Sequence, residues 1–285
     1  VSKAVQTIQT MQLNDGQTDD PPYLFSRYTS VSTDTLMMSG RGPPAKVNGL
    51  SRSLFRPSDD GVTLPYNIPG NAMACTELKH MQEMLQDAAV QAAAAALEVD
   101  LSALSTMLRA VTGGICTALD DVILASAASP STLHLGVLPY EIDGYDSSYY
   151  MDDANVPSLL SLPVLGYISR SNDIYQSTRA FTLSSRNPFY FSGKDGAGVG
   201  GPHEGYNMAW PMAIITQAMT SADDDEIVAC LDQLVRSADG TGFMHESFNV
   251  NDMRDYTRSW FAWANGLFGE LVLQLVVERP HLVVQ

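Results

Sequence analysis

The sequence predicts an all-α protein in which pairs of helices are joined by long loops. Apolar residues recur at three- and four-residue steps in about seven segments, very few segments alternate with the period of a strand, and stretches rich in Gly and Pro separate the helices. Helical hairpins whose long loops gather at one end favour an α/α toroid over a compact bundle. With 285 residues, the chain is long enough to bury a large core.

The predicted helices follow one another along most of the chain. A short helix at 1–11 precedes about 60 residues of ordered loop, and long ordered loops commonly carry function. The further helices are predicted at 71–89 (continuing through the alanine run 88–96), 101–125, 172–183, 207–220, 223–237 and 256–278. Asn172 is a good N-cap for its helix. The last helix has the clearest apolar stripe, formed by Trp260, Ala264, Leu267, Phe268, Leu271 and Leu275.

Three segments between these helices have other patterns. Residues 135–145 resemble a strand and end in Asp-Gly, which predicts a small β-hairpin inserted among the helices. Residues 155–168 are apolar and contain two prolines, which predicts a short, broken helix. Residues 192–205 hold six glycines, and we expect a flexible or tightly turned loop there.

Composition and charge exclude several kinds of partner. The formal net charge of −16 argues against binding to nucleic acid or to an anionic membrane, because a phosphate surface requires Lys and Arg. A neutral substrate such as a sugar is compatible with this charge. The longest apolar stretch, 267–277, is too short to span a membrane, so no membrane segment is expected in the chain.

The three cysteines give little sign of a metal site. Cys75, Cys116 and Cys230 are widely spaced and form no C-x-x-C pair. We expect them to be small buried apolar residues, with one disulfide as the alternative, and we expect no bound metal.

Two loop segments contain adjacent acids. The first, at 55–60, reads F-R-P-S-D-D, and its carboxyl groups beside Arg56 suit a general acid whose orientation is held by a neighbour. The second, at 151–157, reads M-D-D-A-N-V-P, and its Asp and Asn side chains are of the kind that bind vicinal sugar hydroxyls. The alternative in both segments is that the acids only cap a following turn or helix.

Two further loop segments combine an acid with His and aromatic residues. The segment at 201–207 reads G-P-H-E-G-Y-N and suits the rim of a sugar site, although a single His in such a loop is commonly only a surface residue. The segment at 240–248 reads G-T-G-F-M-H-E-S-F, and a carboxylate in this turn is poorly explained by structure alone. It is not a zinc-protease motif, because Asn249 stands where the second His of H-E-x-x-H is needed.

No other catalytic signature is present in the sequence. It lacks a G-x-S-x-G nucleophile elbow and a phosphate-binding P-loop. Several acids in loops, with no nucleophile and no metal ligands, are typical of carboxylate-pair chemistry. Glycoside hydrolysis is the commonest reaction of this kind.

The same segments resemble glycoside hydrolase family 125, exo-α-1,6-mannosidases of bacteria and fungi. The resemblance is carried by F-R-P-S-D-D at 55–60, M-D-D-A-N-V-P-S-L-L-S at 151–161, G-T-G-F-M-H-E-S-F at 240–248 and T-R-S-W-F-A-W-A-N-G-L-F-G-E-L at 257–271. It covers nearly the whole chain in order.

The resemblance implies a single catalytic domain over 1–285, an (α/α)6 barrel, and hydrolysis with inversion and without a metal or other cofactor. Glu246 then resembles the general base, and either Asp59 or Asp60 resembles the general acid, with nothing in the sequence to decide between them. A mannose-containing glycan is the implied partner. The residues that fall in the motifs expected to bind mannose are Arg56, Asp152, Asp153, Asn155, His203 and His245.

An inverting mechanism sets a geometric requirement on these residues. The acid and the base must lie about 6.5–9.5 Å apart to leave room for the attacking water. Aromatic side chains commonly stack on sugar rings, and we expect this of Trp210, whereas Trp260 and Trp263 are expected in the core.

A complete (α/α)6 barrel contains twelve helices, and about seven are predicted here. The sequence therefore resembles the C-terminal part of a family member, incomplete at the N-terminus. Two alternatives follow: a hydrolase for another linkage or sugar, and a truncated carbohydrate-binding protein without activity. The resemblance leaves the compartment open between the cytoplasm, as for bacterial relatives, and secretion or the secretory pathway, as for fungal ones.

Overall fold

A computed structural model describes residues 1–18, 20–129 and 134–283 of the chain. The chain divides into two compact units, which are described separately. Unit 1 comprises Val1–Tyr149 and Leu165–Tyr167, and unit 2 comprises Tyr150–Val164 and Ile168–Gln285. The expectation of one catalytic domain over 1–285 stays a prediction. Helices dominate both units, but the described residues also form three small antiparallel sheets, so the expectation of almost no strand was wrong.

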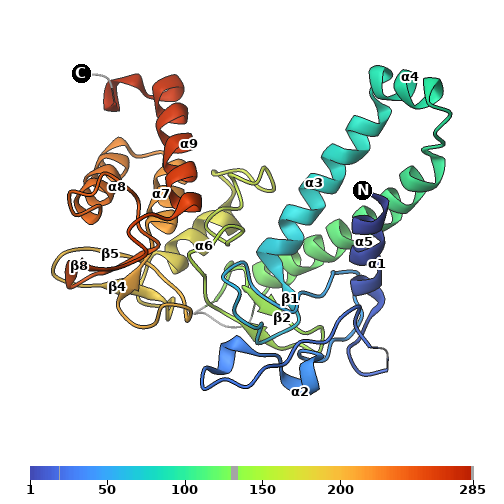
Figure 1. Cartoon of the computed structure of the whole chain (residues 1–285), viewed down its shortest axis with the longest axis horizontal. Coiled ribbons are helices and arrows are strands. Elements are labelled where there is room, and N and C mark those ends of the chain that lie inside the picture. Colours follow the sequence, from blue (N-terminus) through green and yellow to red (C-terminus); the bar gives the residue numbers. More distant parts are fainter. Residues whose placement is uncertain (19, 130–133, 284–285) are drawn as a thin grey trace. The chain divides into compact units, whose positions relative to one another are not determined.

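Unit 1 is built around two long helices that pack side by side. Its elements are α1 (Ser2–Leu13), the 3-10 turn η1 (Ser32–Asp34), α2 (Met37–Gly40), β1 (Tyr66–Asn67), α3 (Ile68–Gln86), α4 (Ala88–Ala96), α5 (Ser102–Ala127), β2 (Glu141–Ile142) and β3 (Ser148–Tyr149). Figure 1 shows α3 and α5 as an antiparallel pair joined at their far end by α4. The predicted helix through the alanine run is therefore two helices, because the side chain of Asp87 accepts hydrogen bonds from the amides of Ala89 and Val90 and starts a new one.

The α3–α5 pair is held together by an apolar stripe and a disulfide. Leu108, Ile115 and Leu119 of α5 are buried, and Cys75 of α3 is bonded to Cys116 of α5. The expectation of three unpaired cysteines was therefore wrong for two of them, since helical packing brings together positions 41 residues apart in sequence. Cys230 is free and buried, as expected.

Helix α5 has the length and apolar composition of a membrane-spanning helix, which the search for long apolar runs in the sequence missed. One third of its most apolar window is buried within the protein. Core helices meet the same criterion of length and composition, and α5 packs against both α1 and α3. The length and composition of α5 are therefore no evidence by themselves that the protein spans or binds a membrane.

The predicted hairpin is present but starts later than expected. Strands β2 and β3 pair antiparallel, and β1 pairs with the other edge of β2. The side chain of Asp143 accepts hydrogen bonds from the amides of Tyr145 and Ser147 and closes the turn. Gly144 has φ +80°, and a Cβ there would lie 2.6 Å from the carbonyl oxygen of Lys46, so this turn requires glycine.

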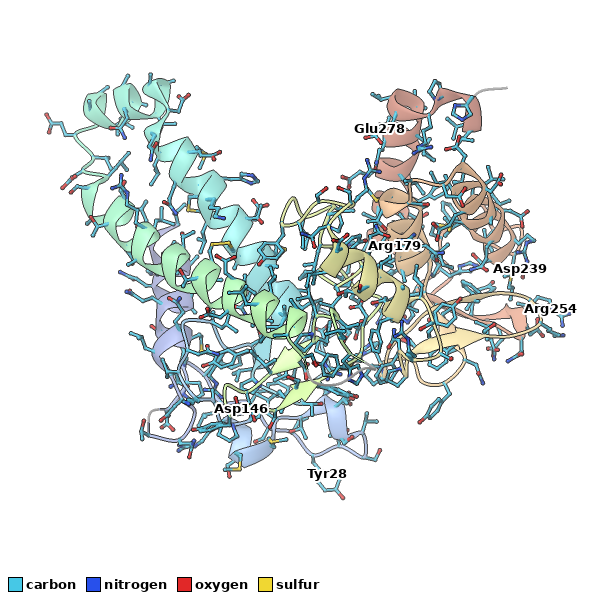
Figure 2. All side chains as sticks on the ribbon, turned by 180° about the vertical axis from the view of Figure 1, so that it is seen from behind. Tyr28, Asp146, Arg179, Asp239, Arg254 and Glu278 are labelled. Atoms are coloured by element: carbon cyan, nitrogen blue, oxygen red, sulfur yellow. A yellow bond between two sulfur atoms is a disulfide. The ribbon has the colours of Figure 1, made fainter. Side chains whose placement is uncertain are left out.

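Unit 2 combines four helices with two small sheets. Its elements are α6 (Asp173–Thr182), β4 (Tyr190–Ser192), β5 (Ala197–Val199), β6 (Met208–Ala209), α7 (Pro211–Thr220), α8 (Asp224–Ser237), β7 (Ser247–Asn249), β8 (Asp252–Thr257), α9 (Ala262–Glu278) and the 3-10 turn η2 (Pro280–Leu282). Helix α7 lies at the centre of the core, which also contains Trp210, Phe248 and Leu271. Arg179 of α6, labelled in Figure 2, donates hydrogen bonds to both carboxylate oxygens of Glu226 on α8.

Two expectations for unit 2 were wrong, and a third was confirmed in part. Residues 155–168 form turns and no helix, because Pro157 and Pro163 lack amide donors and the side chain of Asp152 takes the amides of Leu159 and Leu160. The glycine-rich stretch turns tightly at 193–196, as expected, but its residues 197–199 form β5, which pairs with β4. The last helix starts six residues late, since the segment before it pairs as β8 with β7.

The apolar stripe of the last helix is only partly buried. Ala264, Leu271 and Leu275 lie in the core, whereas Trp260 precedes the helix and is 57% exposed. The expectation that Trp260 and Trp263 pack in the core was therefore wrong. Trp263 is 41% exposed, and Trp210 is the tryptophan that is buried.

The disulfide predicts that unit 1 is sensitive to reduction. Closing a loop of 41 residues restricts the unfolded chain enough to stabilise the folded state by about 4 kcal/mol. We expect a reductant to lower the midpoint of urea unfolding, followed by circular dichroism, in the wild type and in Cys230→Ser. In the Cys75→Ser/Cys116→Ser variant the midpoint is expected to be low already and unaffected by reductant. A wild-type midpoint that does not respond to reductant would contradict this.

Asp152 predicts a pH dependence of stability. Burial raises the pKa of its carboxyl group to about 7, above the value of about 3.9 in an unfolded chain. The folded state therefore binds this proton more tightly, and the stability it contributes is present below about pH 4 and lost as the pH rises through 7. We expect the difference in free energy of unfolding between wild type and Asp152→Asn to fall by on the order of 3 kcal/mol over that range. Parallel curves would show that Asp152 does not titrate differently in the two states.

Candidate active site

The segment at 55–60 forms a tight turn in unit 1. The amide of Arg56 donates to the carbonyl oxygen of Asp60 at 2.8 Å, and the amide of Asp59 donates to the carbonyl oxygen of Arg56 at 3.0 Å. Asp59 has φ +69° and is exposed, whereas Asp60 is 1% exposed and accepts a 2.8 Å hydrogen bond from the hydroxyl of Ser58. The turn therefore gives its two adjacent acids different surroundings.

Arg56 is buried and bound to an acid that the sequence did not single out. Its Nε lies 2.6 Å from Oε1 of Glu141, and its Nη2 lies 3.1 Å from Oε2. Glu141 Oε2 also accepts the backbone amides of Thr63 and Leu64. This ion pair fixes the chain that follows the 55–60 turn, and nothing in the sequence spacing of 56 and 141 could have indicated it.

The segment at 151–155 lies in unit 2, and its two acids differ in their partners. Asp152 binds two backbone amides, as described above, so its position is explained by the local fold. Asp153 Oδ1 accepts hydrogen bonds from the amide and the side-chain nitrogen of Asn155, each at 3.0 Å. Asp152 is therefore a cap, as in the alternative interpretation, and the amides that it binds belong to a turn and not to a helix.

This segment packs against the loop that contains His203. The amide of Ala154 donates to the carbonyl oxygen of Gly200, and a Cβ placed on Gly201 would lie 3.1 Å from Asp153 Oδ2. Glycine at 201 therefore allows the loop to approach the carboxyl group closely. Asp153 therefore lies next to the loop that contains His203.

Glu246 is a buried carboxyl group beside a second one. It is 2% exposed, Arg258 Nε lies 3.2 Å from its Oε2, and the hydroxyl of Thr257 donates to the same oxygen at 3.2 Å. The side-chain ligand atoms of His203, Glu204 and Glu246 all lie within 4.8 Å of one another. Burial, a hydrogen bond with Glu246 and the charge of Glu246 raise the pKa of Glu204, while His203 and Arg258 oppose the shift. The sequence placed Glu204 in a candidate motif but gave it no role.

Three close ligand atoms raise the question of a metal ion. The guanidinium of Arg258 already contacts Oε2 of Glu246, and a bound cation next to it would be repelled. The carboxyl groups of Glu204 and Glu246 interact directly, and a proton shared between them would satisfy both without a cation. The arrangement therefore favours a carboxyl–carboxylate pair over a metal site.

His245 lies beside this pair in sequence but has other contacts. Its ring is buried, stacks on Tyr256 at 3.8 Å, and its Nδ1 lies 2.9 Å from the carbonyl oxygen of Ser259. Among the described residues its Nε2 has no hydrogen-bond partner. Trp210 is also buried, and its ring lies edge-on to His203 at 6.2 Å and to Phe261 at 6.0 Å.

Two relatives match nearly the whole chain. The meiotically up-regulated gene 157 protein of Schizosaccharomyces pombe is 45% identical over 270 residues, which is 94% of this chain and 50% of the relative. A solved structure from Streptococcus pneumoniae, described as a metal-independent α-mannosidase in a non-productive complex with α-1,6-mannobiose, superposes with a TM-score of 0.86 at 36% identity. The alignment covers 98% of this chain and 62% of the Streptococcus pneumoniae chain. The chain thus spans about half the length of the curated relative.

The profile of one enzyme family matches residues 1–273, and the family is described as metal-independent α-mannosidase (GH125). This match covers the turn at 55–60, the segment at 151–155 and the Glu204–Glu246 pair. The chain belongs to the GH125 family.

Proposed function

We propose that this chain hydrolyses terminal α-1,6-linked mannose from a glycan by single displacement with inversion. The observation that carries the proposal is the buried carboxyl group of Glu246, held by Arg258 and Thr257 in a chain of the GH125 family. The complex of the Streptococcus pneumoniae relative with α-1,6-mannobiose supports this substrate. The predicted (α/α)6 toroid is part of the proposal and is supported by the antiparallel α3–α5 pair and by the packing of α7 against α8 and α9.

Glu246 is the proposed general base. Its ionised carboxylate takes a proton from water as the oxygen of that water attacks the anomeric carbon. Arg258 and Thr257 both contact one oxygen of this carboxylate, Oε2. The carboxylate and water are in this way held in one orientation, which is the main requirement for attack from a single face.

Asp60 is the proposed general acid. The glycosidic oxygen leaves as a hydroxyl group after it takes the proton of the acid, while the bond to the anomeric carbon breaks. Asp60 is preferred over Asp59 because its side chain is buried and fixed by Ser58, whereas Asp59 is exposed.

The remaining predicted residues are proposed to bind mannose to different extents. Asp153, Asn155 and His203 are the strongest of these, because Asp153 is hydrogen-bonded to Asn155 and lies against Gly201 of the loop that contains His203. Arg56 and Asp152 are proposed to position the loops, because their polar atoms bind Glu141 and backbone amides. His245 has an Nε2 without a partner among the described residues, which supports a contact to a sugar hydroxyl.

The compartment is also a proposal. A disulfide forms and persists in oxidising surroundings, so the Cys75–Cys116 bond supports passage through a secretory pathway over a reducing cytoplasm. The 45% identity to a yeast protein agrees with a fungal type of chain.

Replacement of Glu246 tests the proposed base. We expect Glu246→Gln to lower kcat on α-1,6-mannobiose by about 10²- to 10⁴-fold, because general base catalysis contributes a factor of that size. Mannose affinity, measured by calorimetry, is expected to stay within about threefold because the amide keeps the shape of the carboxylate. Glu270→Gln, an exposed acid on α9, is the matched control and is expected to act as wild type.

The hydrolysis of mannobiose also tests the stereochemistry of the reaction and the linkage that the enzyme prefers. Proton NMR of the first product is expected to show β-mannose, and α-mannose would overturn inversion. Turnover of α-1,2- or α-1,3-mannobiose in preference to α-1,6-mannobiose would overturn the linkage. Binding of mannobiose without any turnover by the wild type would favour the carbohydrate-binding alternative.

Replacement of the two adjacent acids tests the proposed general acid. We expect Asp60→Asn to lower kcat on α-1,6-mannobiose by about 10²- to 10⁴-fold, and much less on an aryl α-mannoside whose leaving group needs no proton. Asp59→Asn is expected to have little effect on either substrate, since Asn also tolerates a positive φ. The reverse pattern would assign the role to Asp59.

A further inference from the structure

Glu204 is a carboxyl group in direct contact with the proposed base. It lies in the glycine-rich loop before β6, and its carboxyl oxygen, one of Glu246 and a ring nitrogen of His203 lie within 4.8 Å of one another. At this separation the side chains of Glu204 and Glu246 interact directly. Two carboxyl groups can share a hydrogen bond only when one of them carries a proton, because an ionised carboxylate has no donor.

The surroundings decide which of the two carries this proton. Glu246 lies next to the guanidinium of Arg258 and the hydroxyl of Thr257, and both stabilise an ionised carboxylate. Glu204 is half-buried, and the charged groups that act on it are those of Glu246, His203 and Arg258. Burial and the neighbouring carboxylate together raise the pKa of Glu204. The donors around Glu246 and the partial burial of Glu204 favour the proton on Glu204 and the negative charge on Glu246.

We propose that Glu204 is a positioning residue that, as a neutral acid, donates a hydrogen bond to Glu246 and holds it ionised and correctly oriented as the base. This inference rests on the role proposed for Glu246. Glu204 itself transfers no proton to or from the substrate. With Arg258 and Thr257 it completes a set of three donors around one carboxylate.

The inference has a definite consequence for the dependence of activity on pH. The competent enzyme holds one proton on the pair. At low pH a second proton neutralises Glu246, which ends base catalysis and sets the acid limb of kcat/KM. The hydrogen bond from Glu204 stabilises the one-proton state and moves this limb to lower pH. Loss of the donor is therefore expected to move the limb to higher pH.

Two substitutions at position 204 distinguish a hydrogen-bond donor from a side chain that only fills space in the loop. In Glu204→Gln an amide N–H replaces the acid O–H, so the acid limb is expected to stay within about 0.3 pH unit of wild type. In Glu204→Ala the donor is lost, and we expect the limb to rise by about 1 pH unit and kcat to fall about tenfold, with KM changed less than threefold. Glu270→Gln, the exposed acid on α9, is the control and is expected to act as wild type.

A structural role alone would give another result. If Glu204 only supported the loop, Glu204→Ala and Glu204→Gln would both lower Tm and kcat without any shift of the acid limb. An acid limb in Glu204→Ala that coincides with that of wild type would overturn the inference. A rise of the limb in Glu204→Gln as large as that in Glu204→Ala would overturn it as well.

A titration that does not need turnover keeps this test distinct from that of the proposed function. Carbon NMR of protein labelled with 13C at the glutamate carboxyl group is expected to show Glu204 and Glu246 titrating in two linked steps. In Glu204→Gln and in Glu246→Gln the remaining carboxyl group is expected to titrate in one step. If the wild type hydrolyses no α-mannoside yet shows the linked steps, the proposed function fails and the pair stands. If Glu204 and Glu246 titrate independently in the wild type, each in a single step, the proposed interaction between them is overturned.

Discussion

Buried carboxyl groups organise the loops on which the proposed chemistry depends. Glu141 binds Arg56 and two backbone amides, Asp152 binds two backbone amides, and Glu246 binds Thr257 and Arg258. An unpaired charge in a protein interior is strongly unfavourable, so each of these acids fixes the position of every donor it binds. Loops with little regular structure acquire in this way a defined geometry.

The same constraint explains which parts of the fold the sequence could predict. Helices depend on the periodicity of apolar residues and on local caps such as Asn172, and α3, α5, α6 and α8 were found within a few residues of their bounds. The strands were mostly missed because each is two to six residues long and is defined by its partner. The last helix was predicted to begin at 256, but Tyr256 and Thr257 pair with β7 as the end of β8, and this pairing overrides the helical spacing there.

A residue of the candidate site could be predicted from the sequence only when the motif that marks it lies around it in the sequence. Glu246 and the 55–60 turn were found because acids, aromatics and turn residues stand next to one another in sequence. Glu204, Glu141 and Arg258 were not, since their importance comes from partners 42, 85 and 12 residues away. The Cys75–Cys116 bond has the same origin, because only the packing of α3 on α5 brings the two sulfurs together.

The Glu204–Glu246 pair is the place where the fold and the proposed chemistry make opposite demands. Two carboxyl groups in contact destabilise a folded chain when both are ionised, and an apolar or amide side chain at 204 would avoid that repulsion. A single shared proton removes the repulsion and leaves one carboxylate with its charge fixed in place. Arg258, 60% exposed, balances that charge from the solvent side without covering the whole group. Such an arrangement is poorly suited to stability and well suited to a base that must remain ionised in a buried position.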